Sequence, residues 1–327
     1  MTGFSRIITK GGFGAMVVAV GLAVQPLAAA AAEAVHQPYD PPVGSRWTIV
    51  SEGREEKTQD GKSTATTSST RTEELTIVEK TADGYRISTA LRDYDMHGEG
   101  AQIIAANALL GALRDVVVTA IVDRGGKPVR IENLDEVVAA HKRGFERMLG
   151  AFKDKPEAAA KIRELLEPIL TRTAQAPDEA AQWYLETMVQ LSAAQDTDLG
   201  VGEERRSAKA APNPFGGEPI KTNTVLRLVE ADAAAGKAKL VLTQAYDPVA
   251  LKEFTAALAK KIVSGNSLEE MQKVMNEMSL SIDDRTEFVL EHGMTRSLSE
   301  DSLTTVKALG HAISKHERNQ ITVAPMP

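Results

Sequence analysis

The alternation of apolar and polar residues predicts strands toward both ends of the chain. Between residues 44 and 95, apolar side chains recur at every second position, which is the pattern of strands with one face in a core and one in water. The Thr- and Ser-rich run 64–72 suits a solvated strand. Alternation returns after residue 219 and continues in segments to residue 323. The core positions expected in the first segments are Trp47, Ile49, Leu75, Ile77, Tyr85, Ile87, Thr89 and Leu91.

A hairpin and a block of helices are predicted between these strands. Residues 116–122 are apolar on both faces and residues 125–126 supply a glycine turn, so the first strand of this hairpin is expected inside a sheet. Helical spacing of apolar residues then dominates residues 133–195. Asn133, with Glu136 three residues later, predicts a helix start with a capping box. The three expected helices begin at Asn133, Pro156 and Pro177.

These patterns together predict an α+β fold. Strands before and after the helical block each have one apolar face, so neither set is stable until that face is covered. The economical arrangement is one curved, half-barrel-like antiparallel sheet packed against helices, a single domain over 35–327 with a helical insertion at 133–195. Residues 196–219 are predicted as an exposed loop, because their prolines, glycines and charges bury little surface. Two more helices are expected between residues 247 and 278.

The first 34 residues predict an export signal. Arg6 and Lys10 accompany a short basic start, an apolar stretch runs from Gly11 to Val24, and Ala32-Glu33-Ala34 offers small residues at a cleavage site. The apolar run is shorter than the roughly 20 residues of a membrane-spanning helix. We therefore expect cleavage near Ala34, release into the periplasm and no stable membrane anchor.

Composition excludes several classes of function. The chain has no cysteine, which excludes disulfides, thiolate catalysis, Cys-ligated zinc and a lipidated cysteine. Its net charge of -7 argues against nucleic acid or an anionic membrane surface as a partner. Aromatic residues make up only 4% of the sequence, too few for a binding cleft built from stacked rings. No cofactor is implied by the composition.

The most suggestive chemistry lies in Asp93, Asp95, His97 and Glu99, at alternate positions near the end of a predicted strand. In an extended strand these side chains point to one side, as the ligands of a metal ion or an acid/base pair would. The same alternation would carry the charges to the buried face, so the strand is expected to end or bulge near Arg92. A solvated strand end is the favoured interpretation. A metal-assisted hydrolase using Asp93, Asp95 and His97 is the alternative.

Other constellations favour structural roles. The acidic residues of 196–203 resemble a calcium loop but lack its remaining ligands, which favours an acidic loop. His141 lies on an apolar helix face, as a core histidine does. His311 and His316 are five residues apart, which places them on opposite faces of a strand. No nucleophile elbow or phosphate-loop frame is present, so we assign no catalytic, ligand-binding or metal-binding residue.

Several short segments resemble uncharacterised, exported, β-rich proteins of Gram-negative bacteria. These segments are Pro42–Trp47, Val122–Val129, Asn133–Glu136 and Phe288–Met294, spread over much of the chain. At the level of fold, a curved sheet with covering helices is similar to the periplasmic carriers of lipoproteins, whose half-open barrels hold acyl chains. This second likeness is one of fold, which by itself implies no function, and no site residue carries over from it.

The sequence favours a non-enzymatic periplasmic binding or envelope-maintenance protein. One-sided strands and apolar helix stripes are expected to enclose an apolar groove for a lipid-like ligand or a partner segment. Besides the hydrolase, one further alternative is an envelope scaffold that recognises another protein through residues 133–195. The expected partner is a lipid-like ligand or an envelope protein, with no nucleic acid and no cofactor.

Overall fold

The computed structural model describes residues 35–327 except 212–219, 248–277, 309 and scattered positions within 101–112 and 155–175. Its strands are β1 (Val35–Gln37), β2 (Arg46–Gln59), β3 (Lys62–Lys80), β4 (Gly84–His97), β5 (Val117–Asp123), β6 (Pro128–Ile131), β7 (Thr197–Leu199), β8 (Glu204–Ala211), β9 (Ile220–Asp232), β10 (Lys237–Tyr246), β11 (Ser279–Glu291), β12 (Met294–Ala308) and β13 (His311–Pro325). Its helices are α2 (Leu134–Ala151), α4 (Pro177–Tyr184) and α5 (Glu186–Ser192).

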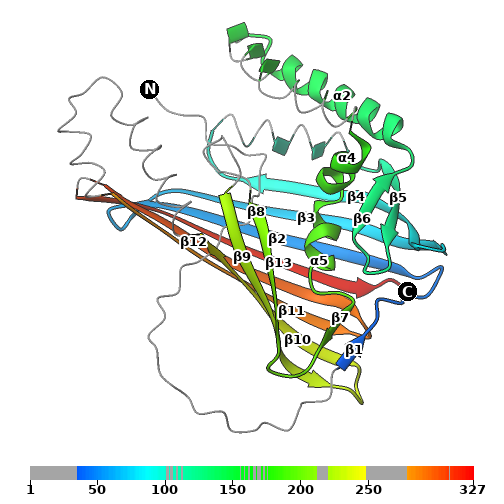
Figure 1. Ribbon diagram of the computed structural model, residues 1–327. Helices are drawn as coiled ribbons and strands as arrows, with labels where there is room; N and C mark the ends of the chain where they lie inside the picture. The colour runs from blue at the N-terminus through cyan, green and yellow to red at the C-terminus, as the bar shows by residue number, and fades with distance from the viewer. Residues whose placement is uncertain are drawn as a thin grey trace.

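Eleven of these strands form one open antiparallel sheet (Figure 1), in the order β6-β5-β4-β3-β2-β13-β12-β11-β10-β9-β8. Strands from opposite ends of the chain meet inside it, where β2 pairs with β13 from Trp47↔Pro325 to Gln59↔Ile313. Every other pair of neighbours is consecutive in sequence. The sheet therefore consists of two meanders joined at the seam between β2 and β13.

One face of the sheet, which we call the covered face, carries the core. Helices α4 and α5 and the small sheet of β1 and β7 lie over this face (Figure 1). The strand residues Ile49, Leu75, Ile87, Leu240 and Leu290 are at most 1% exposed. Burying an aliphatic side chain of this size contributes about 1.5–3 kcal/mol to stability. The opposite side is the outer face, which turns its side chains to solvent.

Hydrogen bonds hold the two short helices against the sheet. In α4, the Gln182 amide donates to the Pro128 carbonyl of β6 at 2.8 Å. In β12, Thr295 Oγ1 donates to the Leu191 carbonyl of α5 at 2.7 Å. Because β6 lies at one edge of the sheet and β12 lies well inside it, these bonds place the helices across several strands.

Asn133 does not cap α2 as the sequence predicts. It occupies the position before the helix but makes no side-chain capping hydrogen bond. Its Oδ1 instead accepts from the Thr119 backbone N–H at 2.9 Å, and its Nδ2 donates to the Val117 carbonyl at 2.7 Å. The amide side chain therefore continues the hydrogen bonding of β6 along β5, past the point where β6 ends.

The predicted α+β class is wrong, because the protein is mostly β. The described part of the chain holds three helices, of 18, 8 and 7 residues, against an open sheet of eleven strands. The predicted half-barrel is replaced by this open sheet, whose edges are β6 and β8. Strands such as β2 and β3, of 14 and 19 residues, run far past their apolar ends into polar segments. Apolar alternation does not mark such segments as strand, although the Thr- and Ser-rich run 64–72, predicted as a solvated strand, does lie within β3.

The loop predicted over residues 196–219 is also incorrect, because β7 and β8 lie within it. β8 pairs with β9 from Glu204↔Arg227 to Ala211↔Ile220 and forms one edge of the sheet. A charged, weakly apolar sequence is typical of an edge strand. The expected leader 1–34 and residues 248–277, where two helices are predicted, lie outside the described residues. None of the described helices is long and apolar enough to cross a bilayer.

Candidate functional site

The candidate group of acids and histidine on β4 lies on the outer face. Leu91 pairs with Glu73, whereas Asp93 pairs with the adjacent Thr72, so one residue of β4 is unpaired between them. This is the bulge predicted near Arg92, and it is confirmed. The extra residue reverses the alternation of the strand. Asp93 and the alternate residues after it therefore face away from the core.

On the outer face these side chains are exposed and paired. Asp93 Oδ1 accepts from Arg114 Nη2 at 2.9 Å, and His97 Nε2 lies 3.1 Å from Asp95 Oδ2. Within the described part of the chain, no three His, Cys, Asp or Glu side chains are placed to hold a metal ion. Nothing in this geometry favours the hydrolase alternative.

The two C-terminal histidines have separate partners. His311 Nδ1 lies 2.9 Å from Asp60 Oδ2, and His316 Nε2 lies 3.0 Å from Asp301 Oδ1. Because the carboxylates differ, the histidines form no shared site. Each instead joins its strand to a neighbouring segment.

His141 is a buried core histidine, as its position on an apolar helix face predicts. Its Nδ1 lies 2.9 Å from the Tyr184 hydroxyl, and its ring stacks on Trp183 with the centroids 5.1 Å apart. Burial lowers the pKa of His141 to about 4, because the charged imidazolium loses its hydration. At neutral pH the ring is therefore uncharged and serves as packing between α2 and α4.

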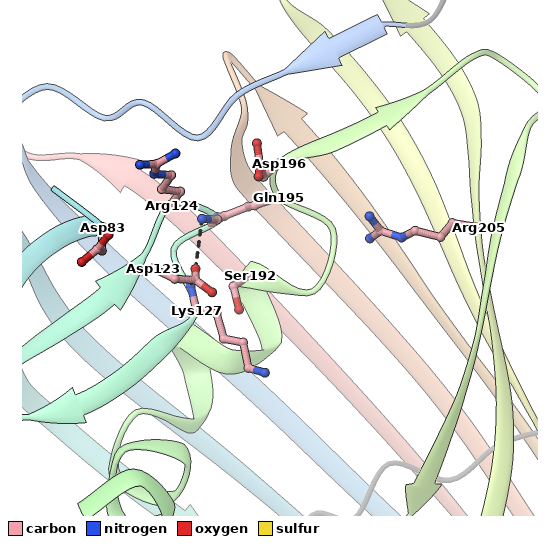
Figure 2. Close-up of a pocket in the computed structure, with 9 residues that line it drawn as sticks. Asp83, Asp123, Arg124, Lys127, Ser192, Gln195, Asp196 and Arg205 are labelled. Atoms are coloured by element: carbon pink, nitrogen blue, oxygen red, sulfur yellow. Dashed lines mark hydrogen bonds between the residues drawn. The ribbon is translucent and has the colours of Figure 1, made fainter.

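A shallow pocket of about 470 Å³ lies at the turn between β5 and β6 (Figure 2). Its lining carries three acids and three bases: Asp83, Asp123, Asp196, Arg124, Lys127 and Arg205. Asp123 Oδ1 accepts from the backbone N–H groups of Gly125 and Lys127, at 3.0 and 2.9 Å, so this carboxylate shapes the turn. When the Gln195 amide is turned so that its oxygen and nitrogen exchange places, it donates to the Gly125 carbonyl at 2.9 Å and accepts from Thr295 N at 3.3 Å. The pocket is therefore a structural joint between the turn, α5 and β12.

The covered face is apolar in one half and polar in the other. Beyond the core residues, the same strands carry polar side chains on this face. We assign these side chains to the face from the strand pairing, since residues directly opposite one another in an antiparallel pair share a face. Along the seam, Ile49 faces Val323, and the next pair on this face is Ser51 with Ile321. We call the following group the polar half: Ser51, Glu55, Arg71, Glu73, Asp284, Glu300, Ser302, Lys315, Glu317 and Asn319.

A row of polar side chains crosses four neighbouring strands in the polar half. Asp284 pairs with Ser302, Ser302 with Glu317, and Glu317 with Glu55. Lys315 Nζ bridges Glu317 at 2.9 Å and Glu55 at 3.1 Å. Asp284 is 7% exposed, and burial, followed by the repulsion of neighbouring carboxylates, raises its pKa to about 8. This row brings together residues that lie more than 200 positions apart in the chain.

Buried polar atoms without hydrogen-bond partners are concentrated in the polar half. Among the described residues they are Ser51 Oγ, Arg71 Nε, Glu73 Oε2, Ser302 Oγ and Asn319 Nδ2, with Tyr39 and His141 contributing one each elsewhere. Leaving a buried donor or acceptor unsatisfied costs about 1–3 kcal/mol. Native proteins satisfy nearly all such groups with protein, water or ligand. The polar half is therefore the candidate functional site, and sequence reasoning missed it.

Comparison with solved structures finds only distant likeness. Lipovitellin, in a structure that describes its lipid–protein interactions, matches 88% of this chain over 26% of its own, with 8% identity and a TM-score of 0.44. An outer membrane channel from Pseudomonas putida F1 matches 92% of this chain over 100% of its own, with 11% identity and a TM-score of 0.16. This chain thus spans about a quarter of the lipovitellin chain. No family model matches the sequence, and no curated protein matches it significantly.

Proposed function

We propose that this chain is a non-enzymatic periplasmic binding protein that holds a lipid-like ligand on the covered face of its sheet. The observation that carries the proposal is the group of partnerless buried polar atoms in the polar half, directly beside an apolar core. A ligand with one polar end satisfies those atoms with that end. The rest of the ligand then lies against apolar side chains of the same face.

Apolar side chains flank the polar half on its far side. Ile282 lies two residues before Asp284 on β11, and it is buried, as are Met278 and Tyr246. The core on the other side is filled by tightly packed side chains such as Ile49. We therefore expect the apolar part of the ligand along Ile282 and Tyr246 rather than inside the core.

The outer face supports the same assignment by contrast. Ion pairs on that face, such as Arg92 with Glu74 and Lys239 with Glu287, are partly solvated. Solvated pairs of this kind contribute about 0–1 kcal/mol and leave no donor or acceptor dependent on a ligand. The buried polar groups that a ligand would satisfy therefore lie mainly on the covered face.

The test is to purify the protein from its host, to look for bound lipid by native mass spectrometry of the intact complex, and to identify that lipid after extracting a second sample with organic solvent. We expect a lipid to accompany the wild type and to be absent from the Ser302→Leu variant, which places apolar bulk in the polar half. Ser299→Leu, on the outer face of the same strand, is the matched control and should retain the lipid. Absence of lipid from the wild type, with no binding of a fluorescent fatty acid, would remove the basis of the proposal.

The periplasmic part of the proposal has its own test. Cell fractionation and N-terminal sequencing are expected to place a chain beginning after Ala34 in the periplasmic fraction. An intact chain, with Arg6 and Lys10 still attached, in the cytoplasm would contradict export without bearing on ligand binding.

A further inference from the structure

We propose that the polar half binds a primary ammonium group, so that the ligand is an amphipathic amine. The inference rests on the proposed function and names the polar end of its lipid-like ligand. The site is the row of Asp284, Ser302 and Glu317, with Glu300 and Glu55 beside it. It is a site for a cation because, among the residues that the structure describes, this row holds more carboxylates than lysines.

The charges in this row are unevenly distributed. Lys57 Nζ lies 2.9 Å from Glu55, and Lys315 Nζ bridges Glu55 and Glu317, so both lysines lie toward the β2 end. At the β11 end, the Asp284 carboxyl group makes no hydrogen bond or ion pair with any described residue. The charged groups that raise the pKa of Asp284 are Glu300 and Glu317 on the same face and, with the smallest effect, Asp283 on the outer face. A cation placed at this end therefore meets attraction from several carboxylates.

Ser302 provides an independent indication of a ligand at the same point. It lies directly between Asp284 and Glu317 across three strands, and it is 4% exposed. Its Oγ has no hydrogen-bond partner in the described part of the chain. This hydroxyl is buried beside carboxylates, where an N–H group of a ligand would supply the missing hydrogen bond.

The chemistry of the row selects a primary ammonium among cations. No group of three potential ligands has the geometry of a metal site in the described residues, which disfavours a metal ion. A quaternary ammonium carries no N–H donor and is usually held by an aromatic cage, whereas this row is built of carboxylates and a hydroxyl. A primary ammonium has three N–H donors and one charge, which match Asp284, Ser302 Oγ and Glu317.

The test measures binding of soluble amphiphiles that share one tail, by isothermal titration calorimetry at pH 9, where Asp284 is ionised and an alkylamine still carries its charge. The probes are octylamine, octanoate and octyltrimethylammonium, and the proteins are the wild type, Asp284→Asn and Asp283→Asn. Asp283→Asn is the matched control, because Asp283 is next to Asp284 in sequence but lies on the outer face, and this substitution removes the same charge. We expect the wild type to prefer octylamine over both other probes by about tenfold, the effect of one charge-assisted hydrogen bond. Asp284→Asn should lose this preference, and Asp283→Asn should keep it.

Two outcomes would overturn the inference. If Asp284→Asn binds octylamine as tightly as the wild type does, or if octanoate binds equally well, the ammonium assignment fails while lipid binding stands. If no probe binds and no lipid co-purifies, the proposed function fails with it. Urea unfolding of Asp284→Asn shows whether a loss of binding reflects the site, since this variant is expected to be at least as stable as the wild type.

A second arm distinguishes the source of the ammonium group. Dihexanoylphosphatidylethanolamine carries a primary ammonium in its headgroup, and dihexanoylphosphatidylcholine carries a quaternary one on the same lipid. Tight binding of the first and weak binding of the second supports a phospholipid headgroup as the source. Tight binding of octylamine alone supports a single-chain amine. Equal binding of both phospholipids, without a preference for octylamine, would count against the inference.

Discussion

Replacing Asp284 by asparagine is expected to remove a pH-dependent cost to stability. Burial first, and then Glu300 and Glu317, raise the pKa of Asp284 from its ordinary value of 3.8 to about 8. Unfolding exposes the carboxyl to water and restores the ordinary value. The folded state binds the proton of the Asp284 carboxyl more tightly than the unfolded state does. The stability that this protonation contributes is therefore complete below pH 3.8 and is lost as the pH rises through 8.

The magnitude follows from this displacement of the Asp284 pKa. While the folded state is protonated and the unfolded state ionised, the free energy of unfolding falls by about 1.4 kcal/mol per pH unit. Between pH 5 and pH 7 the wild type should therefore lose about 3 kcal/mol through this carboxyl. The Asp284→Asn variant does not titrate in this range. The difference in unfolding free energy between variant and wild type should grow by the same amount.

Urea unfolding of ligand-free protein at pH 5, 6 and 7, followed by the fluorescence of Trp47 and Trp183, measures this difference. Other titrating groups are common to both proteins, so they cancel in the comparison. Asp283→Asn is the control and should follow the wild type, because Asp283 is exposed on the outer face. Parallel pH profiles for Asp284→Asn and the wild type would refute the reasoning, since they would mean that Asp284 is hydrated or paired in the folded state.

Three further predictions concern the core and its helices. Ile87→Ala should lower the unfolding free energy by about 2–5 kcal/mol because the side chain is fully buried, whereas Val78→Ala, exposed on β3, should cost less than about 0.5 kcal/mol in the same urea titration. Asn133→Ala should cost about 1–3 kcal/mol and speed hydrogen exchange at the Thr119 amide, which loses its acceptor; unchanged exchange would contradict this. The low pKa of His141 means that the unfolded chain binds more protons, so the wild type should lose about 1.5 kcal/mol between pH 6.5 and pH 5. The His141→Phe variant should show no such loss of unfolding free energy between pH 6.5 and pH 5. A loss as large as that of the wild type would show that His141 is not its source.

The apolar half of the sheet could be predicted from the sequence. Trp47, Ile49, Leu75 and Ile77 alternate with polar residues and are all buried in the structure, because one-sided burial imposes a period of two. The polar half could not be predicted in the same way. There the strands are held by pairing with their neighbours, and their side chains are polar on both faces, so hydrophobic alternation carries no signal.

The candidate site shows a similar limit. The bulge near Arg92 could be predicted, because an unbroken strand would have buried the charges of Asp93 and Asp95. The row of Asp284, Ser302 and Glu317 could not, because these residues come from separate strands whose registers are set by bulges and turns far from them. A sequence without a register gives no indication that Glu317 and Glu55 face one another.

The polar half is the functional candidate because it is where the fold is least satisfied. Lys315 bridges Glu55 and Glu317 across the seam, but Asp284 is buried close to Glu300 and Glu317 and has no ion pair in the described part of the chain. The exposed group around Asp93 and the charged joint at Asp123 have ion pairs, hydrogen bonds or water to satisfy them. Sites at which a sequence conflicts with its own fold are expected to be functional. A bound ammonium would remove this conflict, because it places positive charge between the carboxylates and donors beside the partnerless oxygen of Ser302.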